Sequence, residues 1–424
     1  MACSIFMSLL SIKNKKEVLA WSLYDFANQP FTTIIVTFIY SAFFTKVIAV
    51  NEQIGTTMWA NAIAITAIVV SILSPILGAI ADSGGYRKFF LILFSWMCAI
   101  FSALLYFPKS GDVFFALTLF IIANISFELG TVFCNSYLHN LSDKKNSGRI
   151  SGFAWGLGFF GGLIALFLSL FIFSDLNPIN IRKINILVGI WFFVFSIPTF
   201  IVLKDRKHEK FKKKHLLNSF SSIKTTFKDI YKYKEISQFL VARLFYNDGL
   251  ITIFALGGIY AVGTLKFSFD EVMQLGIVLN MAAGIGSFFF GYIEDKIGVK
   301  TVINITLLVL IIATLVAIYA PETNSPKDFF WLAGILIGLM IGPNQSCSRS
   351  LMAKLTPKAK LNEFFGFFAL TGKATSFIGP LLFGIVTLFY NQQSALWVVV
   401  ILFLFGFFLF NQIKFNLLNS RDEI

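Results

Sequence analysis

Two stretches of the sequence decide the fold: Gly78-Ala-Ile-Ala-Asp82-Ser-Gly-Gly85-Tyr-Arg87-Lys88 and, 213 residues further on, Gly291-Tyr-Ile-Glu-Asp295-Lys296-Ile-Gly298-Val-Lys300. In both, an Asp follows the first Gly by four residues, a second Gly follows the Asp by three, and a cation ends the stretch. Each lies between two long apolar segments. A pattern repeated at matching places in two halves of a chain indicates a duplication, which points to a transporter built from two similar bundles and away from an enzyme or a receptor.

The composition around these stretches is that of an integral membrane protein. Of the 424 residues, 57% are hydrophobic and only 13% are charged, and the mean hydropathy is +0.77. A helix needs about 20 apolar residues to cross a hydrocarbon core about 30 Å thick. Such stretches occur at 18–48, 57–81, 89–107, 113–138, 150–174, 184–203, 237–263, 271–293, 301–320, 329–352, 364–389 and 394–413. We therefore predict an all-α membrane protein with twelve transmembrane helices in two pseudo-symmetric six-helix bundles, and Gly379-Pro380 predicts an interruption in span eleven.

The basic residues predict the orientation of the chain. With the N-terminus in the cytoplasm, most of the 35 Lys and Arg fall in cytoplasmic segments, as the positive-inside rule requires. Both termini are then cytoplasmic, and the net charge of +13 is a topological signal rather than a sign of nucleic-acid binding. A composition heavy in Lys, Ile, Phe and Asn favours a bacterial inner (plasma) membrane over a vacuole.

One substantial hydrophilic segment interrupts the spans, from Lys204 to Glu235. It predicts an N-terminal six-helix bundle (1–203), a basic cytoplasmic linker (204–236) and a C-terminal six-helix bundle (237–424). Apolar residues recur in the linker every three or four residues, and lysines fall on another face: Leu216, Phe220, Ile223, Phe227 and Ile230 against Lys224, Lys228 and Lys232. This periodicity predicts an amphipathic helix on the anionic cytoplasmic leaflet, the alternative being a solvated linker.

Residues for catalysis, metal binding or ATP hydrolysis are not grouped in this sequence. The four Cys show no C-x-x-C spacing, and the three His fall at or outside the predicted cytoplasmic membrane edge, so no zinc site is expected. No Walker motif is present. We therefore expect a protein that is not an enzyme, needs no cofactor or metal, and acts as a monomer in the lipid bilayer on a small-molecule substrate.

The repeated loop predicts a cytoplasmic gate. Glycine lets neighbouring helices approach closely and permits the tight turn between them. The Asp then lies at the cytoplasmic end of a span, and the cations after it can pair with it or with a helix end in the opposite half, which would hold that side shut. The alternative is a positively flanked turn that only fixes topology. The residues assigned to the gate are Gly78, Asp82, Gly85, Arg87, Lys88, Gly291, Asp295, Lys296, Gly298 and Lys300.

The form of this loop resembles the signature of the major facilitator superfamily. In that family Gly-x-x-x-Asp-x-x-Gly lies between spans two and three and again between spans eight and nine. The first copy departs from the family pattern, with Ser83 where a cation follows the Asp and with an added Tyr86. The gate is thus expected to be more complete in its second copy.

A narrower resemblance, to the vacuole-effluxer-like (autophagy-related amino-acid effluxer) branch of that superfamily, covers nearly the whole chain. It is carried by Trp21-Ser-Leu-Tyr-Asp25-Phe-Ala-Asn28, Gly148-Arg-Ile-Ser-Gly152, Tyr246-Asn-Asp248-Gly, Gly257-Gly-Ile-Tyr260, Asn344-Gln-Ser-Cys-Ser-Arg349-Ser, Glu363-Phe-Phe-Gly366 and Thr371-Gly-Lys373-Ala-Thr-Ser-Phe-Ile-Gly379-Pro380. That branch includes fungal proteins implicated in releasing amino acids from the vacuole, and bacterial members of unassigned substrate. The resemblance implies an amino acid or a similar small metabolite as the transported solute.

Several polar and ionisable side chains lie at membrane depth, where a charge costs about 2.5–3.5 kcal/mol on insertion scales. A charge facing lipid would be unpaired, so these side chains should face a central cavity. Most of them fall on spans one, four, seven and ten, and the superfamily resemblance implies that these spans line the cavity. The residues predicted to line it are Asp25, Asn28, Asn124, Glu128, Arg243, Asp248, Asn344, Gln345 and Lys373.

Two interpretations of these charges remain open. In the functional one, a buried carboxylate binds and releases a proton, while Arg243 or Lys373 holds an anionic group of the substrate. In the other, the charges form permanent interhelical pairs, such as Glu128 with Lys373 or Asp25 with Arg243. The sequence therefore predicts a secondary active transporter of a small solute by alternating access, with protons as an optional partner. The alternatives are a drug or metabolite exporter, and a membrane sensor or lipid-handling protein without solute flux.

Overall fold

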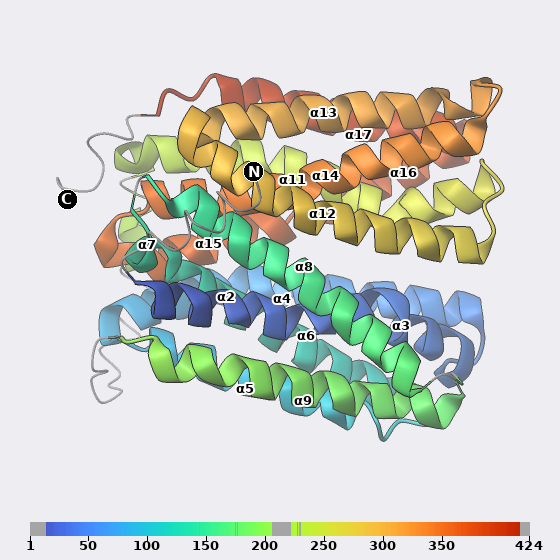
Figure 1. Ribbon diagram of the computed structural model, residues 1–424, viewed down its shortest axis with the longest axis horizontal. Helices are drawn as coiled ribbons and strands as arrows, with labels where there is room; N and C mark the ends of the chain where they lie inside the picture. Colours follow the sequence, from blue (N-terminus) through green and yellow to red (C-terminus); the bar gives the residue numbers. More distant parts are fainter. Residues whose placement is uncertain are drawn as a thin grey trace. The chain divides into compact units, whose positions relative to one another are not determined.

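The computed structural model describes residues 14–415, except 144, 174, 176, 206–221, 227 and 229. Every regular element in these residues is a helix (Figure 1). Twelve helical segments are long and apolar enough to cross a membrane, which confirms the number of predicted spans: Lys15–Ile48, Gln53–Gly84, Arg87–Leu104, Val113–Leu141, Ser147–Ile172, Pro178–Val202, Tyr231–Gly263, Asp270–Ile297, Val299–Glu322, Pro326–Leu355, Lys358–Phe389 and Gln392–Asn411.

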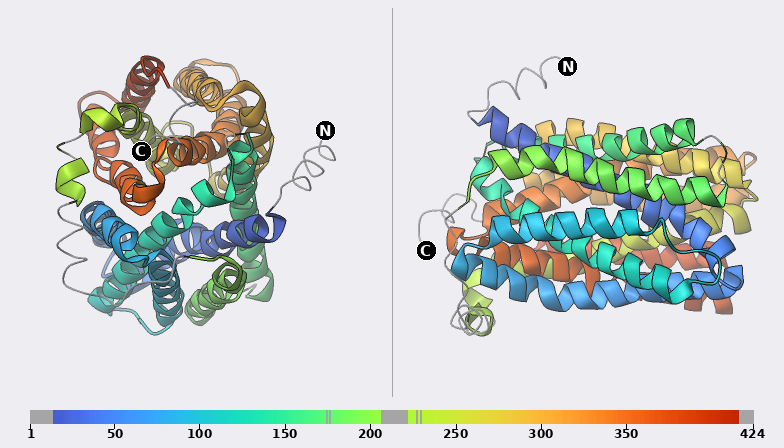
Figure 2. Two further views of the ribbon diagram at one scale, coloured as in Figure 1. Left: turned by 90° about the vertical axis from the view of Figure 1, so that its left-hand side faces the viewer. Right: turned by 90° about the horizontal axis from the view of Figure 1, so that it is seen from below.

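One compact unit contains residues 1–141, 157–223 and 359–369. Its complete helices include α2 (Lys15–Pro30), α4 (Glu52–Gly84), α5 (Arg87–Leu104), α6 (Val113–Ser136) and α9 (Pro178–Val202). Helix α5 packs against α6 and α9, and α2 packs against α9 (Figures 1 and 2). Large aromatic side chains fill the core, and two of them also make polar contacts: Trp21 Nε1 donates to the Cys134 carbonyl oxygen at 2.8 Å, and the Tyr24 hydroxyl lies 2.9 Å from Ser95 Oγ.

The other compact unit contains residues 142–156, 224–358 and 370–424. Its complete helices include α11 (Lys234–Gly263), α12 (Phe269–Ile297), α13 (Val299–Tyr319), α14 (Pro326–Leu355), α16 (Ile378–Phe389) and α17 (Gln392–Asn411). Helix α14 packs against α12 and α13, and α11 packs against α17. A Cβ atom on Gly338 of α14 would lie 2.8 Å from the Leu279 carbonyl oxygen of α12, so this helix contact requires a glycine.

Two helices contribute residues to both units: α8 (Ser147–Ile172) and α15 (Leu361–Lys373). The first turns of α8 belong to the second unit, and most of α15 belongs to the first. The six-helix bundles with limits at 203 and 237 remain a prediction.

Two spans are irregular at membrane depth. In span one, α2 ends at Pro30 and a π-helix follows at Phe31–Phe38, then α3 (Tyr40–Phe43) and a second π-helix at Phe44–Ile48. In span eleven, α15 ends at Lys373 and α16 begins at Ile378, so the interruption lies at 374–377, a few residues before the predicted position; Gly379 and Pro380 lie in the first turn of α16. Proline fits the first turn of a helix because its missing N–H has no partner there.

The predicted amphipathic helix of the linker lies largely outside the described residues, with Leu216, Phe220 and Phe227 among those not described. Residues 222–226 are helical and a 3-10 turn follows at Ile230–Tyr233. His208 and His215 also lie outside the described residues.

Candidate functional site

The first copy of the repeated loop caps a helix. Asp82 lies at the end of α4, and its Oδ1 accepts hydrogen bonds from the backbone N–H of Asn362 at 3.1 Å and from Asn362 Nδ2 at 2.7 Å. Its Oδ2 accepts from the backbone N–H of Glu363 at 2.8 Å. The two backbone N–H groups lie at the positive N-terminal end of α15, where they have no acceptor within the helix. A carboxylate at this position therefore stabilises the helix. A Cβ atom on Gly78, one turn earlier, would collide with the Asn362 carbonyl oxygen, so glycine permits the approach.

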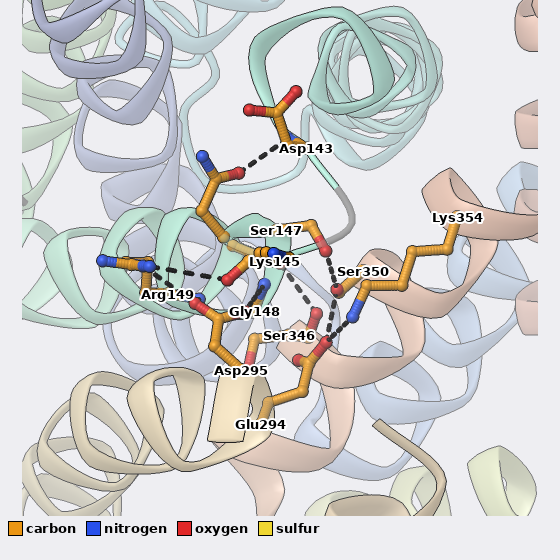
Figure 3. Close-up of polar contacts among 12 residues, drawn as sticks. Asp143, Lys145, Ser147, Gly148, Arg149, Glu294, Asp295, Ser346, Ser350 and Lys354 are labelled. Atoms are coloured by element: carbon orange, nitrogen blue, oxygen red, sulfur yellow. Dashed lines mark hydrogen bonds and ion pairs between the residues drawn. The ribbon is translucent and has the colours of Figure 1, made fainter. Parts of the chain in front are cut away.

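The second copy caps a helix in the same way (Figure 3). Asp295 lies at the end of α12 and accepts hydrogen bonds from the backbone N–H groups of Gly148 at 2.9 Å and Arg149 at 3.2 Å, in the first turn of α8. Arg149 Nε adds an ion pair at 2.9 Å. Gly291, one turn before Asp295, packs directly on Gly152 of α8. The two loops therefore bind the starts of α15 and α8, each of which comes from the opposite half of the sequence.

The glycines after each Asp end the preceding helix. Gly85 and Gly298 have φ angles of 71° and 90°, in the left-handed region that side chains disfavour. The predicted tight turns are thus present.

The cations of the two loops bind partners other than those expected. We expected them to pair with the Asp or with a helix end in the opposite half of the sequence. Lys88 Nζ instead donates to the Leu203 carbonyl oxygen at 2.7 Å, at the end of α9, and Lys300 Nζ donates to the Ile413 carbonyl oxygen at 2.6 Å, beyond the end of α17. Each lysine thus ties its loop to the last helix of its own half, where the negative end of the helix attracts a cation.

The other two cations, Arg87 and Lys296, differ from these lysines in their contacts. Arg87 is buried, with its Nη2 3.3 Å from Asp205 Oδ1 and its Nη1 donating to Asn140 Oδ1 at 2.8 Å. Lys296 is exposed, and its Nζ lies 4.5 Å from the centre of the Tyr292 ring on the same helix. The cation next to Asp295 is therefore not its partner.

A buried polar network beside the second loop was not predicted (Figure 3). Glu294 accepts from Lys354 Nζ at 2.7 Å and from Ser350 Oγ at 2.6 Å. Arg349 is fully buried and donates through Nε to Ser151 Oγ at 2.9 Å. The sequence contained a signal for this network. Glu294 is a second acid directly before Asp295, and Arg349 is a charged residue in a predominantly uncharged span.

At membrane depth, three consecutive polar contacts join α11 to the interruption of span eleven. Arg243 Nη1 donates to Thr371 Oγ1 at 3.1 Å, and Asn247 Nδ2 donates to the Gly372 carbonyl oxygen at 3.3 Å. The Thr375 hydroxyl donates to Asp248 Oδ1 at 3.1 Å.

Two neighbouring residues on α14 face different helices. Gln345 Nε2 donates to Asn247 Oδ1 at 3.1 Å and so joins the polar contacts of α11. Asn344 Nδ2 donates to Thr306 Oγ1 of α13 at 2.9 Å, away from those contacts. Lys373 is the last residue of α15 and is half-buried.

In the other unit, the predicted cavity residues lie on two helices. Asn28 of α2 and Asn124 of α6 are buried, and Asp25 and Glu128 on the same helices are half-buried. Polar and ionisable side chains inside spanning helices are costly and are therefore candidates for function, and for these four residues that role stays a prediction. Among the described residues no cluster of three or more His, Cys, Asp or Glu could hold a metal ion.

Comparison with known proteins identifies the family. The profile of the "Vacuole effluxer Atg22 like" family matches residues 55–417. The chain belongs to this family. It is 28% identical over 403 residues to an uncharacterised MFS-type transporter, YxiO, of Bacillus subtilis, covering 92% of this chain and 93% of that protein. It is 26% identical over 289 residues to autophagy-related protein 22-1 of Neosartorya fischeri, covering 62% of this chain and 47% of that protein.

The fold of this Atg22-like protein is that of the major facilitator superfamily. The solved structure of the proton:xylose symporter XylE, an MFS protein, matches with a TM-score of 0.72 at 14% identity, over 94% of this chain and 95% of that chain. With the family match and the MFS-type relative in Bacillus subtilis, the protein is a multi-pass membrane transporter of the major facilitator type.

Proposed function

We propose that this Atg22-like protein is a secondary active carrier that moves a small solute, an amino acid or similar metabolite, across the bacterial plasma membrane by alternating access. The observation that carries the proposal is the matching pair of helix caps at Asp82 and Asp295. Each carboxylate holds the start of a helix from the opposite half of the sequence. Paired contacts of this kind can be made and broken together, which a carrier requires and a static structural protein does not.

We assign these caps to a cytoplasmic gate, with both termini in the cytoplasm. Opening would release three hydrogen bonds at Asp82, and two hydrogen bonds and an ion pair at Asp295. Lys88 and Lys300 would keep each loop attached to its own half while the caps break. The gate thus has contacts that separate and contacts that persist.

We assign the substrate to the polar side chains at membrane depth. Among the residues that the sequence places at membrane depth, Arg243 and Lys373 carry the positive charge that a carboxylate needs, and Asp25 and Glu128 carry the negative charge that an ammonium group needs. A zwitterion suits such a mixture better than an apolar drug does. The name of the fungal relative, an autophagy-related protein, and the effluxer name of the family support a metabolite as cargo.

A comparative metabolite profile tests this proposal without assuming a substrate. Cells with and without the protein are compared, and a strain that carries Arg243→Gln serves as the transport-defective control. The expected result is a change in one or a few amino acids that the variant fails to restore. A change in drug tolerance alone would favour the exporter alternative, and altered lipid distribution without a metabolite change would favour lipid handling.

A further inference from the structure

Asp248 differs from two other buried carboxylates of its unit, Glu294 and Asp295, because no cation among the described residues pairs with it. Glu294 has an ammonium group at 2.7 Å, and Asp295 has a guanidinium group at 2.9 Å as well as two backbone N–H donors. Asp248 is only 3% exposed, and its carboxylate accepts a single hydrogen bond, from the Thr375 hydroxyl at 3.1 Å. No ion pair joins it to any residue between 14 and 415 that the structure describes. A buried carboxylate in this state is costly as an anion.

The end of α15 and the start of α16 both lie close to Asp248: Thr375 donates to its carboxylate, and a Cβ atom on Gly379 would lie 3.0 Å from its carbonyl oxygen. Helix α15 ends at Lys373, two residues before Thr375, and the carbonyl end of a helix is its negative end. Within the interruption, the backbone N–H of Ser376 donates a hydrogen bond to the Lys373 carbonyl oxygen at 3.3 Å. Unwound backbone and helix C-terminal ends of this kind hold coupling cations in transporters with discontinuous helices.

The charged groups near Asp248 do not compensate it. Arg243, on the same helix as Asp248, donates its hydrogen bond to Thr371. Lys373 is the last residue of α15, before the interruption. Helices α16 and α17, which both pack on α11, carry no charged residue. The remaining charged residues on α11 and on elements that pack against it, or that continue into the interruption, are Lys232, Lys234, Glu235, Asp270, Glu271, Glu294, Asp295, Lys296, Lys327, Asp328, Arg349, Lys354 and Glu363.

We propose that Asp248 and Thr375 form a binding site for a monovalent cation, H⁺ or Na⁺, at the interruption of span eleven. Both ions neutralise the carboxylate, and the hydroxyl of Thr375 can donate to the anion or turn its oxygen toward the cation. Binding would change the contact between α11 and residues 374–377.

The same segment connects this site with the substrate contacts. Arg243 and Asn247 hold Thr371 and Gly372, only a few residues before Thr375. A cation at Asp248 and an anionic substrate group at Arg243 would thus act on one short irregular segment. This coupling rests on the carrier function proposed above, whereas the cation site itself does not.

Stability of the purified protein in detergent, without any solute, tests the site. The melting temperature is measured with NaCl against choline chloride at constant ionic strength, and separately as a function of pH. If Na⁺ is the ion, the wild type has a higher melting temperature in NaCl than in choline chloride. If H⁺ is the ion, lowering the pH raises the melting temperature of the wild type more than that of Asp248→Asn. Asp248→Asn should lose the response to the ion and melt no lower than the ion-free wild type, because the amide imitates the neutralised carboxylate.

Matched variants separate a binding role from a structural one. Asp328→Asn makes the same change at an exposed position of the same unit and should keep the full response. Thr375→Ser keeps a hydroxyl and should keep the response. Thr375→Val should weaken Na⁺ binding about tenfold, because a ligand oxygen is lost, but should not weaken H⁺ binding, because the hydroxyl donates to the anionic carboxylate. If Asp248→Asn responds to both ions as the wild type does, the proposal is wrong.

Flux measured in parallel separates this site from the carrier function. Solute flux that is independent of Na⁺ and pH, in a protein that neither ion stabilises, would overturn the cation site and leave the carrier intact. A cation response lost in Asp248→Asn, with no solute flux at all, would support the site and count against the carrier.

Discussion

The buried ion pair between Glu294 and Lys354 provides the sharpest stability prediction. Their side chains are 0% and 7% exposed, and the Nζ to Oε1 distance is 2.7 Å. Lys354→Met preserves an unbranched side chain but leaves the Glu294 carboxylate buried with neutral partners, the Ser350 hydroxyl and the Cys347 thiol. Breaking a buried pair from one side costs about 3–5 kcal/mol of unfolding free energy, because the remaining charge is uncompensated. We expect a loss of that size in a denaturant titration of the purified protein.

The pair between Lys327 and Glu271 is a matched control. It has the same residue types and nearly the same distance, 2.8 Å, but its side chains are 44% and 32% exposed. Lys327→Met should cost only about 0–1 kcal/mol, because water screens an exposed pair. The double variant Glu294→Gln with Lys354→Met should regain most of the stability. Equal losses for the two Lys→Met variants, or no recovery in the double variant, would refute the reasoning from burial.

Three further predictions concern the repeated loop. Asp295→Asn should increase labelling of cysteines introduced near the gate more than Asp82→Asn does, since only the former also weakens an ion pair; equal effects would count against the difference between the copies. Gly78→Ala should cost about 1–3 kcal/mol of unfolding free energy because its Cβ meets the backbone, whereas Gly257→Ala, which has nothing within 4 Å, should cost nothing. Lys300→Met removes two hydrogen bonds, to the Asn411 and Ile413 carbonyl oxygens, and should cost about 1.5–3 kcal/mol of unfolding free energy without changing the gate labelling; increased labelling would mean that this lysine belongs to the part that separates.

Much of the fold could be predicted because the membrane imposes it. Apolar length gave the twelve spans, and Gly379-Pro380 gave the interruption of span eleven, since both follow from local chemistry. The irregular second part of span one, from Phe31 to Ile48, was missed, although Pro30 was a visible signal for it. The turns at Gly85 and Gly298 were likewise readable, because a tight helix-to-helix turn needs a positive φ.

Partners distant in the sequence were not predictable from one sequence. The donors to Asp82 lie about 280 residues away, and those to Asp295 about 147 residues away. Neither spacing follows from hydropathy, because many helix ends reach the same membrane edge. The cations of the loops were assigned to the wrong partners for this reason.

Side-chain direction was a second limit. Gln345 and Asn344 are adjacent, yet they face α11 and α13, because successive helical residues point about 100° apart. Span position alone cannot decide which of them lies with the polar contacts of α11. The buried charge of Lys354 was overlooked for a related reason, since it looked like one more basic residue at a membrane edge.

Counterflow of labelled amino acids in liposomes shows directly whether the protein is a carrier. Protein-containing vesicles are loaded with an unlabelled mixture and diluted into labelled solute, and Arg182→Gln, outside the polar contacts of α11, serves as the control for Arg243→Gln. A carrier that alternates access should accumulate label transiently with the wild type and the control, and about tenfold more slowly with Arg243→Gln, in which a charged contact to the solute is lost. Label that enters no faster than in protein-free vesicles, while labelled phospholipid is scrambled, would contradict the account.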